Sequence, residues 1–348
     1  MRTAFTVLVG LLAASSAFYF FRSLHKQTPL PKTTVAKFSL WKNQFRKLYA
    51  TPQEDQYRLS VFASQVDTVD RLNEKYNLYL EKTGQPALQE PMFTLQEDSD
   101  LTTEEFTKLK TGLQLPEGET IEIDESPIQE ITEPNLSQTS YQHRIRNQGS
   151  CGSCWAFSTV ATLEKMYYDL NRVQVDLSQQ YLVDCATVAN GCSGGWPSVV
   201  YTWIQTNDIV MNSVYPYQAA VTACKRSQFS AAQFAKLAPK ITSKNLGWSL
   251  ATAIRVSNSG VSSGVVLFAS GGFRYVSKND DIFDPQALGE CSSRINHAVV
   301  MIAANTNFVT IQNSGGTWFG DKGFKKYKPC GANLHGDPSY VTHTYPNV

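Results

Sequence analysis

Cys154 opens a segment whose composition suits a reactive thiol. The residues from Cys154 to Asn171 are apolar on most sides at the start, with Trp155 and Phe157 among them, so we expect a buried helix. A cysteine in the first turn of a helix lies at the positive end of the helix dipole, which lowers the thiol pKa and makes thiolate available. A buried inert thiol and a zinc site shared with Cys151 are the alternative interpretations.

A thiolate that cleaves an amide also needs a proton donor for the leaving amine, which is usually a histidine. His297 stands at the start of the apolar run Asn296-His297-Ala298-Val299-Val300, where a strand would hold its ring rigidly. The same position also suits a purely structural histidine. The other four histidines lie outside the expected core, at its edge or in the polar tail: His25, His143, His335 and His343.

The local pattern is Cys151-Gly152-Ser153-Cys154-Trp155, followed by His297 and Asn313 at 143 and 159 residues beyond Cys154. This pattern, with His and Asn about 130–150 residues downstream, marks the papain/cathepsin nucleophile. Gln148 stands six residues before Cys154, and further ordered segments follow: Leu177–Cys185, Asn190–Gly195, Tyr215–Tyr217, Cys330-Gly331 and Tyr345–Val348. From about Gln148 to Val348, the chain therefore resembles the papain family of cysteine proteases, most closely its cathepsin L-like branch.

The resemblance implies a cysteine endopeptidase that works through a covalent acyl-enzyme, with neither cofactor nor metal. Cys154 would be the nucleophile, His297 its acid and base, Asn313 the residue that orients His297, and Gln148 an oxyanion donor. The expected substrate-binding residues are a glycine wall and an apolar pocket for the residue two before the cut: Gly194, Gly195, Trp196, Pro197 and, more weakly, Val266 and Ala298. No insert resembling an occluding loop is visible, which favours internal cleavage.

All seven cysteines lie between Cys151 and Cys330, and an odd count suggests three bridges and one free thiol. The resemblance implies the bridges Cys151–Cys192, Cys185–Cys224 and Cys291–Cys330, which leave Cys154 unpaired. Disulfides persist in the secretory pathway, so we expect a secreted protein or one of the lysosome or an acidic vacuole. The net charge of +1 gives no global field for nucleic acid. The expected partners are polypeptide substrates and the chain's own propeptide, with the protein a monomer.

Four segments are expected along the chain. Residues 1–22 hold the uncharged run Thr3–Phe21, which is a cleaved signal peptide or a membrane anchor. Residues 33–110 resemble the family's inhibitory propeptide through Glu54, Arg58, Phe62 and Asn73, with Gln65 and Val69 as conservative departures from the family's Asn and Ile. The Pro-rich, acidic residues 111–130 form a linker with the processing region. Residues 131–348 form the peptidase domain, and Asn135 begins a glycosylation sequon.

The fold class expected is α+β: a papain-like two-lobed fold, with a helical left lobe and a β-barrel-like right lobe, preceded by a helical propeptide. Apolar periodicity predicts two helices within 33–80, a short helix capped by Thr102 or Thr103, and helices over 154–171, 177–185 and 198–206. Strands are predicted over 265–269, 298–303 and 308–312. The turn Asn305-Thr306-Asn307 would join the last two as a hairpin and bring His297 beside Asn313.

One residue departs from the family pattern at the expected site. The family has Trp after Asn-Ser, whereas this chain has Gly315 after Asn313-Ser314. We expect Trp318, on the same loop, to fold back over the gap. Two alternatives stay open: a catalytically weak or inactive homologue that acts as a binding protein, and a structural disulfide-rich secreted domain.

Overall fold

The computed structural model describes residues 31–115, 117, 141–235, 242–244, 253–254, 257, 263–267, 269, 271–291, 295–328 and 340–342. The run Thr3–Phe21, most of the linker and Asn135 lie outside these residues. Of the helices in the described ranges, none is both long and apolar enough to span a membrane. The chain divides into two compact units, the first ending at Ala63 and the second beginning at Ser64.

The described residues of the first unit, 31–63, contain parts of two helices. They are α2 (Lys32–Phe45) and the start of α3 (Pro52–Lys82), which continues into the second unit. The rings of Phe38 and Trp41 on α2 pack on the fully buried ring of Phe62, with centroids 5.2 and 5.1 Å away. The apolar periodicity predicted both helices, and the packing of these aromatic rings joins them.

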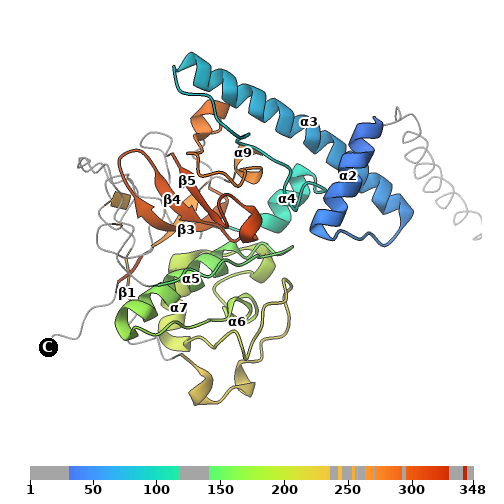
Figure 1. Cartoon of the computed structure of the whole chain (residues 1–348). Coiled ribbons are helices and arrows are strands. Elements are labelled where there is room, and N and C mark those ends of the chain that lie inside the picture. Colours follow the sequence, from blue (N-terminus) through green and yellow to red (C-terminus); the bar gives the residue numbers. More distant parts are fainter. Residues whose placement is uncertain are drawn as a thin grey trace, which may run out of the picture. The chain divides into compact units, whose positions relative to one another are not determined.

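An antiparallel sheet forms the β half of the second unit (Figure 1). Its strand order is β2 (Ser263–Leu267), β3 (His297–Ala304), β4 (Val309–Gln312) and β5 (Phe324–Tyr327). The β3–β4 hairpin was predicted, and its turn is closed by Asn305, whose side-chain oxygen accepts from the main-chain N–H groups of Asn307 and Phe308. A small separate pair, β1 (Thr242–Lys244) with β6 (Tyr340–Thr342), was not predicted and neither was β5.

The helical half comprises α5 (Cys154–Asn171), α6 (Gln179–Cys185) and α7 (Pro197–Asn207). A short 3₁₀ turn, Gly191–Ser193, lies between α6 and α7, and two more follow α7: Arg226–Gln228 and Ala231–Gln233. The core here holds fully buried side chains that include Trp155, Leu163, Leu177, Tyr181 and Val200. Helix α5 also packs against β3, so it lies where the helical and β halves meet.

Disulfides fix the loops of the helical half. Cys151 is bonded to Cys192 and Cys185 to Cys224, the pairings that the family resemblance implied. Cys291 is also disulfide-bonded, and its expected partner Cys330 lies outside the described residues.

The sheet has its own core, and residues of the propeptide segment are part of it. Val69, Tyr76 and Leu80 of α3, with Met92 and Phe93, pack with buried residues of the β half. Asn73 holds this segment in place by pairing with both main-chain groups of Phe93, at 2.9 and 3.0 Å. The short elements nearby are α4 (Thr103–Lys110), α9 (Gly271–Arg274), Pro285–Leu288 and Gly316–Trp318. Thr102 caps α4 through a reciprocal bond pair with Glu105.

Candidate active site

Cys154 is the first residue of α5 and is fully buried. Among the described cysteines it alone carries a free thiol. Burial raises the pKa of this thiol to about 11, while main-chain groups of Ala298, Trp155 and Gly112 oppose the shift. Ala298 therefore lies beside the sulfur, and it directly follows His297 in strand β3.

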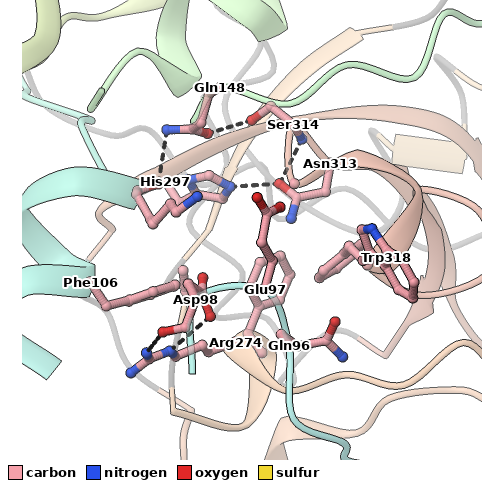
Figure 2. A pocket seen from close by; sticks show the side chains of 15 residues that line it. Gln96, Glu97, Asp98, Phe106, Gln148, Arg274, His297, Asn313, Ser314 and Trp318 are labelled. Atoms are coloured by element: carbon pink, nitrogen blue, oxygen red, sulfur yellow. Dashed lines mark hydrogen bonds and ion pairs between the residues drawn. The ribbon is translucent and has the colours of Figure 1, made fainter. Parts of the chain in front are cut away.

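His297 and Asn313 meet because the β3–β4 hairpin brings the start of one strand beside the end of the other. His297 Nε2 lies 2.8 Å from Asn313 Oδ1 (Figure 2). An amide oxygen only accepts, so Nε2 carries the proton of the neutral ring and Nδ1 is left as the basic atom. Nδ1 is buried with no hydrogen-bond partner among the described residues, and burial lowers the pKa of His297 to about 4.

Gln148 presents its side-chain amide to the same site. Its Nε2 donates to the main-chain oxygens of Cys151 and Lys110, at 2.9 and 3.1 Å. Its Oε1 accepts from the Ser314 hydroxyl at 2.6 Å, so the orientation of the amide is fixed (Figure 2). The Lys110 main-chain oxygen therefore accepts a hydrogen bond from the amide group that could polarise a substrate carbonyl oxygen.

Gly195, one of the two glycines expected to bind substrate, pairs with the main chain of residues 112–114, which follow the proposed propeptide. Gly195 donates to the Gly112 oxygen at 2.9 Å, and its own oxygen accepts from the Gln114 N–H at 3.1 Å. A Cβ on Gly195 would lie 2.7 Å from the Trp155 ring, and Gly194 has φ +129°. Both positions therefore require glycine for backbone contact with an extended chain.

Apolar side chains surround the thiol. Trp196 and Ala298 cluster with Cys154, and Leu113 packs among them with Val199 and Ile295. Pro197 is the buried first residue of α7. Leu113 thus packs against Trp196 and Ala298, two of the residues expected to bind the substrate residue two before the cut.

Two aromatic residues near His297 bear on the departure at Gly315. Trp318 lines the same cavity as His297 and Asn313, but its ring faces the Lys278 ammonium, 3.5 Å from the centroid. The ring that packs edge-on against His297 is Phe273, with centroids 5.8 Å apart, and Phe319 packs on Phe273 at 4.9 Å. Sequence reasoning missed Phe273 because α9 has four residues and gives no periodic signal.

Two family models match the chain. Residues 134–336 match the papain family cysteine protease model, and residues 38–106 match the cathepsin propeptide inhibitor domain. The chain is 28% identical to ananain of Ananas comosus over 332 residues, covering 88% of each chain. It is 27% identical to papain of Carica papaya over 319 residues, covering 89% of this chain and 86% of papain.

Solved structures of proforms share the fold. Procathepsin L 3 of the Tenebrio molitor larval midgut aligns with a TM-score of 0.68 at 21% identity, over 90% of this chain and 99% of that one. The proform of Amb a 11, a cysteine protease of ragweed pollen, aligns with a TM-score of 0.69 at 21% identity, over 91% and 97%. The chain therefore belongs to the papain family of cysteine proteases and carries a cathepsin propeptide inhibitor domain ahead of the peptidase.

Proposed function

We propose that Cys154, His297, Asn313 and Gln148 are the catalytic residues of this cysteine endopeptidase precursor. The supporting observation is the buried His297–Asn313 bond, which leaves His297 Nδ1 as the basic atom in the residue that precedes Ala298. Ala298 in turn lies against the one free thiol among the described cysteines. A nucleophile, a base and an orienting residue are therefore close together.

The proposed reaction follows from these positions. The thiol proton passes to His297 Nδ1, and the thiolate attacks the scissile carbonyl carbon. Gln148 Nε2 and the Cys154 N–H stabilise the resulting oxyanion. The imidazolium then gives its Nδ1 proton to the departing amine, and the acyl-enzyme is hydrolysed by a water molecule that His297 activates.

We further propose that residues 110–114 block this site in the precursor. A substrate would place its earlier residues along Gly195 and its later ones beyond Cys154. The propeptide does the opposite, because Leu113 and Gln114 lie at Gly195 while the preceding Lys110 carbonyl faces Gln148. The reversed direction supports inhibition without cleavage. The domain limits proposed are 33–110 for the propeptide, 111–130 for the linker and 131–348 for the peptidase, with inhibitory contacts extending to Gln114.

The disulfides are consistent with the oxidising compartments in which cathepsin-type proteases typically reside. We propose export through the run Thr3–Phe21, followed by residence in an acidic vacuole or lysosome, or secretion. Sequencing the N-terminus of the exported protein tests the first step. A start at Met1 in a membrane fraction would favour the anchor.

The test of function uses the full chain and its Cys154→Ser variant. We expect the wild-type precursor to hydrolyse a fluorogenic peptide after acidification and shortening, whereas Cys154→Ser keeps the fold by circular dichroism and loses nearly all hydrolysis. Iodoacetamide should label one cysteine and abolish activity. A shortened, folded wild-type protein that turns over no peptide would favour the inactive-homologue alternative.

A further inference from the structure

Arg274, the last residue of α9, is a buried arginine of the peptidase whose polar contacts reach into the propeptide. Its Nε lies 3.2 Å from Asp98 Oδ1, and its Nη2 donates to the main-chain oxygens of Leu101, at 2.9 Å, and Asp98. The Phe106 ring covers the guanidinium, with 4.7 Å between its centroid and Cζ. Removal of the propeptide would take away all of these partners and expose the charge.

Arg274 also lines the cavity that contains the proposed catalytic residues. Figure 2 shows Arg274 and Asp98 on one side of this cavity and His297 and Asn313 across it. Glu97, Asp98 and Lys110 line the cavity from the propeptide. Among the described lining residues of the peptidase, Arg274 is the one lysine or arginine. Lys278, whose ammonium lies over the neighbouring Trp318 ring, is a second positively charged group near the cavity.

The position of this cavity relative to Gly195 indicates which substrate residues it would bind. Residues before the cut bind along Gly195 and in the Trp196 pocket, where Leu113 now lies. The cavity holds the earlier propeptide residues 96–98, 106 and 110 and is walled by His297, Asn313 and Trp318. A substrate that runs through the site would therefore place the residues after its scissile bond here.

We propose that Arg274 selects substrates that carry a carboxylate just after the scissile bond, and that Asp98 fills this carboxylate position in the precursor. This proposal rests on the proposed function. The guanidinium fork matches carboxylate geometry, and no peptidase acid among the described lining residues competes for it. The carboxylate has two sources: an Asp or Glu side chain, or the C-terminal group of a short peptide product.

The experiment compares paired peptides on the matured enzyme. Internally quenched peptides carry Glu or Gln at the first or second position after the cut, and a second pair ends after one such residue as the free acid or the amide. We expect kcat/KM to favour the charged member of one pair by about three- to tenfold. The preference should weaken as ionic strength rises. The two pairs identify the source of the carboxylate.

Three variants assign the preference to a residue. Arg274→Gln should bring the charged-to-neutral ratio close to one, and Arg274→Glu should invert it. Arg172→Gln, a change of an exposed arginine at the far end of α5 from Cys154, should keep the wild-type ratio. Because the readout is a ratio within one enzyme, altered overall activity does not affect it.

Each result bears on a distinct claim. Equal cleavage of both members of both pairs by the wild-type enzyme overturns the proposal without any variant. A preference that persists in Arg274→Gln also overturns it. If the wild-type enzyme cleaves none of the peptides, including a fluorogenic amide that lacks residues after the cut, the proposed function itself fails.

Discussion

In the precursor the thiol of Cys154 and the imidazole of His297 are both neutral. Burial raises the pKa of Cys154 to about 11 and lowers that of His297 to about 4, so between these limits one proton stays on sulfur. A released thiolate–imidazolium pair also holds one proton. Release of the propeptide therefore transfers a proton from Cys154 to His297 and takes up no proton from solvent. Acid triggering must therefore come from groups other than this pair.

The buried neutral thiol predicts a difference in alkylation. Iodoacetamide should react with Cys154 of the precursor slowly below pH 9, with a rate that climbs toward the pKa of about 11. The matured enzyme should react quickly near pH 6, since a thiol paired with His⁺ is ionised there. Rates measured by mass spectrometry decide this, with Cys154→Ser as the unreactive control. Equal rates for both forms at pH 6 would refute it.

Phe273 is the residue that we expect to protect the His297–Asn313 bond in place of the family Trp. Phe273→Ala should admit water and lower kcat about tenfold with little change in KM, because a charge-assisted hydrogen bond contributes about 1.5–3 kcal/mol. Phe273→Tyr should restore most of kcat. Trp318→Ala, which removes a ring that faces Lys278, should cost less. The reverse order of the two alanine variants would favour the original expectation for Trp318.

At the scale of elements, inhibition depends on one extended segment that lies very close to the peptidase backbone. A Cβ on Gly112 would lie 1.9 Å from the Gly152 oxygen, so only glycine fits there. Gly112 and Leu113 also share the Asn296 oxygen as acceptor, at 3.1 Å each. Main-chain hydrogen bonds therefore hold the segment in place, and close contact with Gly152 allows only glycine at position 112.

Gly112→Ala should displace the inhibitory segment, residues 110–114, from the active site. The precursor with this change should hydrolyse peptide at neutral pH before any shortening, at least tenfold faster than the wild-type precursor. Gly84→Ala is the matched control, because its Cβ would meet nothing within 4 Å. It should leave the precursor inactive even though Gly84 has φ +67°, where alanine is strained. If the Gly112→Ala precursor hydrolyses no peptide before shortening, the segment can accommodate the added methyl group and the prediction is wrong.

Helices α2, α3 and α5 and the β3–β4 hairpin could be predicted because each has an apolar period or an Asn-rich turn of its own. Strand β5, whose sequence Phe-Lys-Lys-Tyr is half charged, could not, since its pairing with β4 decides it. At the site, Cys154, His297 and Asn313 had a recognisable spacing. Phe273 and Arg274 had none, because their roles arise from contacts between segments far apart in the chain.

Within the second unit, the propeptide and the β half contribute to one shared core, which is separate from the core of the helical half. Phe93 is 1% exposed and packs edge-on against Tyr76 of α3 and Phe283 of the peptidase, at 5.6 and 5.9 Å. It also pairs with Val276 through the main chain. Separation of the propeptide would expose this apolar surface on both sides, so the contact opposes opening.

Phe93→Ala should therefore loosen the precursor as a whole. Truncation of a buried Phe costs about 3–5 kcal/mol, which would raise the open fraction by roughly two orders of magnitude or more. We expect urea unfolding at lower concentration and shortening at a higher pH than in wild type. Leu78→Ala, at a side chain of α3 that is 46% exposed, is the control and should change neither. Since residue 93 is lost on maturation, the matured Phe93→Ala enzyme must match wild type in kcat/KM. A matured enzyme with altered kcat/KM would instead mean that Phe93 guides folding of the peptidase and does more than hold the precursor closed.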